Sequence, residues 1–385
     1  MCTEWALWPN LGCIIERNLV FEPIPAPADA PARADLIRRI HSTRRIPNPW
    51  AGDAARGIPA VRLAELLGEW AEGFDWSVPE ERIRAYPWES AGVGTRALRV
   101  IHQRAENPDA SAVVLLHGWP DSVLRFERVL PLLRDLNVVV PALPGFPYAL
   151  PLTGEPISTA DIAEMVAEAM FALGYDRYVV SGGDVGGTVG EILAATHPES
   201  VSALHLTNLA ASRVAMIDPA HAHPEEREFA ALAGRWRQAN GGFVAEQATR
   251  PGTVTTMLGD SPAALLAWIG EKLQGWAGSA DAFGAADILT WVSAYWFTET
   301  AGTALSTYAV PAALPDRIEV PTVYSAFGRD FLSAPREFVQ RFVNLAVFSE
   351  HNDGGHFAAW EEPAAYVDDL RRAVRLSPAG PAASR

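Results

Sequence analysis

Cysteine is nearly absent from this chain, which has only Cys2 and Cys13 among its 385 residues. Both lie close to the amino terminus, far from every motif that could carry chemistry. Two cysteines so placed suggest neither a disulfide scaffold nor a thiol nucleophile. We therefore expect an activity that does not depend on cysteine.

Long apolar runs and an excess of basic residues are missing as well. No run approaches the roughly 18 residues that cross a bilayer, and the first residues do not combine a basic stretch with an apolar core. We expect no membrane span and a cytoplasmic location. Acidic residues outnumber basic ones, 46 against 31, for a formal charge of -15. Because no basic stripe offsets this charge, nucleic acid is not an expected partner.

The composition is that of a folded globular protein, with 49% hydrophobic and 20% charged residues. Short strands alternate with helical patterns over residues 96–210 and again over 311–376, which predicts an α/β fold with a mostly parallel sheet and helices on both faces. A helical region over residues 1–95 precedes this sheet. A Trp-rich helical stretch over residues 211–310 predicts an inserted lid, and residues 377–385 predict a flexible tail.

The strongest motif is SGGDVGGTVG at residues 181–190, between a predicted strand and a predicted helix. Glycines on both sides of Asp184 leave room for a sharp turn whose central residue is strained and exposed. This is the pattern of a nucleophile elbow with Asp184 as the nucleophile. The alternative is a tight glycine turn in which Asp184 caps the next helix. The spacing matches neither a phosphate loop nor a dinucleotide-binding loop.

An aspartate nucleophile restricts the reaction. A carboxylate that attacks an sp3 carbon gives an alkyl ester, whose carbonyl water can then attack, whereas a serine would leave an inert ether. Asp184 therefore favours epoxides or alkyl halides over ordinary esters.

A second motif, HGWP at residues 117–120, follows the apolar strand SAVVLL. In a hydrolase of this type the loop offers a backbone N–H that forms an oxyanion hole with the amide after the nucleophile. We expect Trp119 and Val185 to supply these two amides. His117 is interpreted as a hydrogen-bonded loop residue rather than a base.

The base is predicted to be His356, on the GGH loop that follows the last strand. The chain order of nucleophile, acid and histidine is that of an α/β-hydrolase. For the acid we prefer Asp330, after the strand VPTVYSAF, because Asp353 is too near His356 in sequence and the other usual position holds the neutral Asn208. A packing role for the histidine and a surface turn for Asp330 are the alternatives.

No metal site is expected. His221 and His223 form a pair, but only acidic residues follow and no third ligand has recognisable spacing. The lid tryptophans, Trp268 among them, together suggest an apolar substrate cavity between lid and sheet.

These motifs, with the segments LIRRIHSTRRIP and TRPGTVTTMLGDSPAALLAWIGEKLQGW, make the chain resemble the microsomal-type epoxide hydrolase family over nearly its whole length. The resemblance implies an α/β-hydrolase fold, hydrolysis of an epoxide to a diol through an Asp184 ester, and no cofactor. It implies an amino-terminal region that wraps around the core.

Two lid tyrosines of that family hydrogen-bond the epoxide oxygen and protonate it. Tyr308 matches one of them, and Phe243 stands where the other is usual, so one donor is lost unless another such as Tyr295 replaces it. A lost donor typically costs about 10² to 10³ in rate. Val185 also replaces a usual Trp, and Glu299 lies in TET where TGT is more common.

Two rival activities remain on the same fold. A haloalkane dehalogenase shares the aspartate nucleophile but needs side-chain N–H donors for halide, and Val185 removes one of them. The other rival is a non-hydrolytic, cyclising or binding protein. This alternative stays open because Phe243 lacks the hydroxyl donor that is usual at its position. The expected partners are a small epoxide and water; the oligomeric state stays open, with a homodimer as one option.

Overall fold

The computed structural model describes residues 22–377 except 93, 153–154, 219 and 332. The two cysteines and the tail residues 378–385 lie outside the described residues. The structure confirms the predicted α/β-hydrolase fold, and the described residues form one sheet of eight strands in the order β1-β2-β4-β3-β5-β6-β7-β8. The strands are β1 (Trp88–Ala91), β2 (Leu98–Gln103), β3 (Ala112–Leu116), β4 (Asn137–Pro141), β5 (Tyr178–Gly182), β6 (Val201–Leu206), β7 (Ile318–Phe327) and β8 (Val343–His351).

The sheet brings the chemistry-bearing loops to one edge. Strands β3 to β8 pair in parallel, while β1 and β2 run antiparallel to their neighbours. Strands β3, β5 and β6 are buried along their whole length, which explains their continuous apolar runs. Because parallel strands end on the same side, the loops that follow β3, β5, β7 and β8 meet there.

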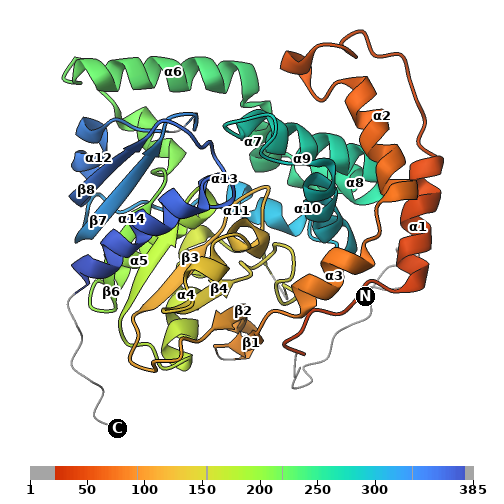
Figure 1. The fold of residues 1–385 in the computed structure, drawn as a ribbon. Helices are drawn as coiled ribbons and strands as arrows, with labels where there is room; N and C mark the ends of the chain where they lie inside the picture. Colours follow the sequence, from red (N-terminus) through yellow and green to blue (C-terminus); the bar gives the residue numbers. More distant parts are fainter. Residues whose placement is uncertain (1–21, 93, 153–154, 219, 332, 378–385) are drawn as a thin grey trace, which may run out of the picture.

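Helices cover both faces of the sheet (Figure 1). On one face α4 (Thr159–Ala172) packs against α5 (Val185–Thr196), and α14 (Pro363–Leu376) contacts the same strands as α5 from the opposite face. The smaller helices of the sheet region are η3 (Gly94–Arg96), η4 (Val123–Phe126), η5 (Leu130–Leu132), α12 (Arg336–Phe342) and α13 (Ala358–Glu361). The predicted start of α4 is confirmed, since Ser158 and Asp161 form a reciprocal capping box.

The amino-terminal region is helical but shorter than predicted. Its helices are α1 (Ala30–His41), η1 (Ala54–Arg56), α2 (Ala60–Gly68), η2 (Glu69–Gly73) and α3 (Ser77–Arg84). The boundary at residue 95 is wrong, because Trp88–Ala91 already form β1, which pairs with β2 at the edge of the sheet. A strand of four residues is too short to show a reliable two-residue alternation in sequence.

Residues 211–310, here called the cap segment, lie between β6 and β7 and contain no strand among the residues described. Their helices are η6 (Ala211–Met216), α6 (Pro224–Asn240), α7 (Gly242–Thr249), α8 (Pro251–Asp260), α9 (Pro262–Trp276), α10 (Ala285–Phe297), η7 (Thr303–Leu305) and α11 (Ser306–Ala309). Helices α8 to α10 lie beside α1 and α2 of the amino-terminal region (Figure 1).

A fully buried ion pair holds both ends of the cap segment to the core. Glu191 of α5 accepts from the Ala210 amide at 2.7 Å and pairs with Arg213 at 2.6 Å. Arg213 also donates to the Pro315 carbonyl at 2.9 Å. The segment therefore leaves and rejoins the sheet through one set of polar contacts.

Candidate active site

Asp184 occupies a strained turn between β5 and α5. Its φ is 55° and its ψ is -128°, a left-handed conformation that costs a non-glycine residue of order 1–3 kcal/mol. The glycines around it permit this turn, because a Cβ on Gly182 would overlap the backbone of Gly186, and one on Gly186 would overlap the Leu116 carbonyl. The Asp184 side chain makes no capping hydrogen bond to α5. This geometry matches the predicted elbow rather than a capping aspartate.

The HGWP loop presents an amide to this carboxylate. The Trp119 N–H donates to Asp184 Oδ1 at 2.8 Å. Gly118 must be a glycine for the loop to come so close, since a Cβ there would overlap the Asp184 carboxylate. Val185 is the first residue of α5, and the first amides of a helix have no partner within it. The structure thus brings the Trp119 amide to the nucleophile, and Val185 follows the nucleophile directly at the start of α5.

His356 and Asp330 complete a line of side chains behind Asp184. Nδ1 of His356 lies 3.2 Å from Asp330 Oδ1, and its Nε2 lies 3.4 Å from Asp184 Oδ2 without forming a hydrogen bond. The histidine ring is fully buried. Asn208, which the sequence shows only as a neutral residue at an acid position, bridges the line: it accepts from the Asp184 amide at 2.8 Å and donates to Asp330 Oδ2 at 3.2 Å.

The two carboxylates control the protonation of His356. Burial alone would disfavour the imidazolium, but the charge of Asp330 and the contact with Asp184 outweigh burial and raise the pKa of His356 to about 9. In the resting site the ring is therefore positively charged at neutral pH.

The other candidate groups lie apart from this line. Asp353 is exposed and pairs with Arg329 at 3.4 Å. His117 uses Nε2 to accept from the Leu143 amide at 3.1 Å, in agreement with its interpretation as a loop residue. His221 contacts Asp218 at 2.6 Å on the surface, and the part of the chain that is described holds no cluster of three metal-ligating side chains.

Aromatic rings of the cap segment cover the HGWP loop and the base. Phe243 stacks on Trp119 with ring centroids 5.3 Å apart and planes 12° apart, and Tyr308 meets Trp119 edge-on at 5.7 Å. Trp276 lies 5.1 Å from Phe243 and 5.3 Å from the His356 ring. These rings therefore present an apolar surface over the HGWP loop and the His356 ring.

Tyr308 is the phenol that packs edge-on against Trp119 of the HGWP loop. Burial and the charge of Asp184 raise the pKa of Tyr308 well above its usual value, so the phenol keeps its proton. The buried Gln247 accepts from Trp268 Nε1 at 3.0 Å, and its amide nitrogen interacts with the Tyr308 hydroxyl but makes no well-formed hydrogen bond. Trp268 itself packs against the Lys272 ammonium at 4.4 Å, so its contacts are with Gln247 and Lys272 of the cap segment.

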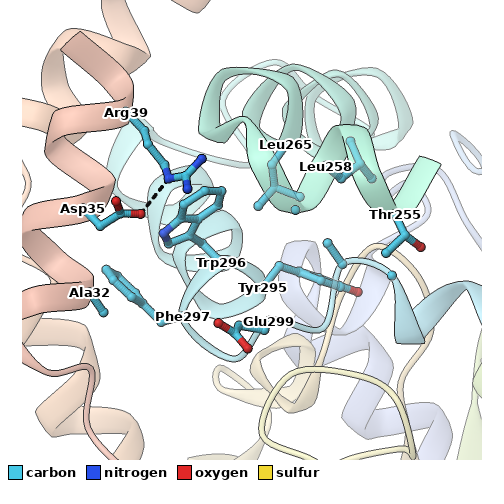
Figure 2. A pocket seen from close by; sticks show the side chains of 13 residues that line it. Ala32, Asp35, Arg39, Thr255, Leu258, Leu265, Tyr295, Trp296, Phe297 and Glu299 are labelled. Carbon is cyan, nitrogen blue, oxygen red and sulfur yellow. Dashed lines mark hydrogen bonds and ion pairs between the residues drawn. The ribbon is translucent and has the colours of Figure 1, made fainter. Parts of the chain in front are cut away.

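Tyr295, expected to contact substrate, is placed differently. Its hydroxyl donates to the Asp121 carbonyl at 2.9 Å, so its proton is already engaged. Its ring lines a cavity of about 390 Å³ between α1, α8 and the end of α10, to which Asp184 and His356 do not contribute. Figure 2 shows this cavity with the Asp35–Arg39 pair of α1 on one side and Tyr295 on the other.

Glu299, which lines the same cavity, is one departure from the family pattern. Its φ is 56°, a conformation that suits glycine, which is the residue expected there from TGT. The glutamate therefore adds local strain and places a carboxylate in the lining of this cavity (Figure 2).

Comparisons with known proteins agree with this geometry. The profile of the alpha/beta hydrolase fold matches residues 111–256, and that of the epoxide hydrolase N terminus matches residues 23–126. A protein of Stigmatella aurantiaca named "Putative epoxide hydrolase" is 32% identical over 89% of this chain and 82% of its own length. Epoxide hydrolase 1 of Sus scrofa is 26% identical over 89% of this chain and 86% of its own length.

A solved structure extends the likeness to three dimensions. An enantioselective mutant of the epoxide hydrolase from Aspergillus niger superposes with a TM-score of 0.84 at 30% identity, covering 94% of this chain and 98% of its own. Fold, amino-terminal region and sequence identity thus lead to one assignment: the chain belongs to the microsomal-type epoxide hydrolase family.

Proposed function

We propose that this chain hydrolyses an apolar or bulky epoxide to a vicinal diol through a covalent ester on Asp184. The observation that carries the proposal is the convergence on one carboxylate of the Trp119 amide at 2.8 Å and His356 Nε2 at 3.4 Å, with Asp330 3.2 Å behind the imidazole. Asp184, His356 and Asp330 then act as a catalytic triad.

The first step uses the Asp184 oxygen that the oxyanion hole leaves free. The Trp119 amide holds Oδ1, so Oδ2 attacks one carbon of the epoxide ring and the bond from that carbon to the ring oxygen breaks. The electron pair passes to the epoxide oxygen, which takes a proton from Tyr308. The raised pKa of Tyr308 supports this role, since the phenol enters the reaction protonated.

The second step hydrolyses the ester. A water molecule attacks the Asp184 carbonyl carbon and gives its proton to His356 Nε2, while Oδ1 becomes an oxyanion held by the amides of Trp119 and Val185. The bond from the carbonyl carbon to Oδ2 then breaks, Oδ2 takes the remaining proton of the attacking water, and the neutral diol leaves with Oδ2. The carboxylate is restored with one oxygen from water.

Ester formation itself prepares the base. The pKa of His356 is raised to about 9 while Asp330 and Asp184 are both charged, and a charged imidazolium cannot accept a proton. Alkylation makes Asp184 neutral, which removes one of the two carboxylates and lowers the pKa of His356. The imidazolium then gives its proton to the Tyr308 phenolate that ring opening leaves, so the phenol is restored and His356 is neutral when the water must be activated.

The aromatic rings of the cap segment are the evidence for an apolar or bulky substrate. Phe243 and Trp276 pack around Trp119, whose amide meets Asp184, and offer ring faces rather than hydrogen bonds. With Phe243 in place of a tyrosine, Tyr308 is the single phenol assigned to the epoxide oxygen, because Tyr295 already donates to Asp121. No cofactor is required by this sequence of steps.

A screen of racemic aryl and bulky aliphatic epoxides tests the proposal, with diol formation measured by chromatography and chloride release from haloalkanes measured in parallel. We expect diol and no halide, and no diol from Asp184→Asn. Chloride release without diol formation would assign the chain to the dehalogenases instead, for which Val185 supplies no side-chain donor.

A further inference from the structure

A buried ion pair lies directly behind the HGWP loop. Asp121 ends this loop and Arg125 follows one turn later in η4, and both side chains are almost fully buried. We propose that Asp121 and Arg125 are positioning residues that hold the oxyanion amide and the base in register for ester hydrolysis. This inference rests on the proposed function.

Asp121 holds the oxyanion loop. Its Oδ1 accepts from the Gly118 amide at 2.6 Å, and Gly118 is the residue before the Trp119 amide that meets Asp184. The Asp121 carbonyl accepts from Tyr295 at 2.9 Å, so the loop is also tied to the cap segment. A shift of Asp121 would therefore move the oxyanion donor relative to the nucleophile.

Arg125 connects this loop to the base. One guanidinium nitrogen pairs with Asp121 Oδ2, and Nη2 donates to the backbone carbonyl of His356 at 2.5 Å. The guanidinium also lies under the elbow, because a Cβ on Gly183 would come within 3.3 Å of Nη2. One side chain thus touches the loops that carry the oxyanion donor, the nucleophile and the base.

Both groups stay charged in this setting. Burial opposes the ionisation of Asp121, but the charge of Arg125 and the contact with His117 outweigh burial and hold the pKa of Asp121 below its usual value. The Asp121 carboxylate likewise overcomes burial and raises the pKa of Arg125. A buried ion pair is weak evidence that the pair stabilises the fold, since apolar side chains in its place often give equal stability. The fixed geometry of such a pair can instead specify one arrangement of the segments that it joins. The contacts of this pair indicate that the arrangement specified is that of the catalytic loops.

The two reaction steps depend differently on Arg125. Ester formation needs Asp184, its oxyanion amide and Tyr308, while ester hydrolysis also needs His356 aligned with water. A misplacement of about 1 Å can cost ~10² in rate. Loss of the contact between Arg125 and the His356 carbonyl should therefore slow the second step selectively.

The test is Arg125→Lys in the full chain, with single-turnover rates of alkylation and of ester hydrolysis measured on an epoxide that wild type accepts. Lysine keeps the charge opposite Asp121 but cannot reach both partners with a planar fork. We expect hydrolysis to fall about 10²-fold and alkylation less than about threefold, so that the alkyl-enzyme accumulates and is visible by mass. The folded fraction of Arg125→Met should show the same ratio of hydrolysis rate to alkylation rate as Arg125→Lys.

The matched control is Arg213→Lys. Arg213 is equally buried and joins a carboxylate, Glu191, to a carbonyl, that of Pro315, but it contacts none of the three catalytic side chains. The Arg213→Lys enzyme should lose a similar free energy of unfolding to Arg125→Lys and keep the wild-type ratio of hydrolysis rate to alkylation rate. Equal slowing of both steps in Arg125→Lys, or no slowing, would overturn the positioning role. If wild type itself forms no alkyl-enzyme, the proposed function fails instead.

Discussion

Trp119 donates its backbone N–H to Oδ1 of Asp184 at 2.8 Å although 65 positions separate the two residues in the chain. The contact fixes which carboxylate oxygen remains free, because Oδ2 is left facing His356. It also depends on Gly118, the one residue type at that position that lets the loop approach the carboxylate. The proposed reaction depends on this pairing of a loop after β3 with a turn after β5.

Gly118→Ala should abolish activity by displacing the HGWP loop from Asp184. The new Cβ would overlap the carboxylate, so the oxyanion amide must move, with an expected loss of at least about 10² in alkylation rate. Gly234→Ala is the control: Gly234 has open space in the middle of α6, and alanine there should keep activity and stabilise by about 1 kcal/mol. Stopped-flow alkylation and thermal unfolding check both variants, and an active Gly118→Ala enzyme would contradict the loop geometry.

Asp330→Asn should keep the fold and strongly slow ester hydrolysis, because the imidazole loses the carboxylate at its Nδ1. Asp353→Asn is the matched control, since this side chain is 71% exposed and pairs only with Arg329 among the interactions of the described residues. Steady-state rates on one epoxide compare the two. The reverse result, an impaired Asp353→Asn and an unaffected Asp330→Asn, would mean that the acid is misassigned.

Neutralising Asp184 should lower the pKa of His356. In wild type the pKa is raised to about 9, so the ring is charged below that pH; Asp184→Asn removes one of the two carboxylates and imitates the charge of the ester. An NMR titration of the His356 ring in both proteins measures the difference. Hydrolysis of the alkyl-enzyme should correspondingly become faster as pH rises through the lowered pKa. Identical titration curves in the two proteins would refute the charge argument.

Tyr308→Phe should slow alkylation by about 10² to 10³, because no second phenol remains to share the developing charge. Phe243→Tyr should speed ring opening or widen the range of epoxides, since it adds a hydroxyl to a ring that stacks on Trp119. Single-turnover alkylation rates decide the matter. An unchanged rate in a correctly folded Tyr308→Phe enzyme would remove Tyr308 from the mechanism.

The sequence was sufficient to predict a feature wherever residues close together in the chain are also its physical cause. The glycines beside Asp184 are needed because neighbouring backbone leaves no room for a Cβ, and the same glycines make the elbow visible in sequence. The capping box that starts α4 is local in the same way, since Ser158 and Asp161 are three positions apart. The predicted parallel sheet likewise implies that the loops after β5, β7 and β8 lie on one side, because parallel strands end on the same side of a sheet.

The sequence was insufficient where contacts join distant segments. Arg125 reaches the His356 carbonyl across 231 positions, and Tyr295 reaches the Asp121 carbonyl across 174, so no spacing reveals either. Asn208 was noticed only for lacking a charge, whereas its amide bridges Asp184 and Asp330. The edge strand Trp88–Ala91 was missed because four residues carry too little periodicity.

One measurement tests the covalent mechanism most directly: a single turnover with enzyme in excess over epoxide in water labelled with 18O. The account predicts that the diol carries no label, because its new oxygen is Oδ2 of Asp184, and that the label appears in the peptide containing Asp184. A diol labelled in that first turnover, with an unlabelled peptide, would show that water attacks the epoxide directly and would contradict the account.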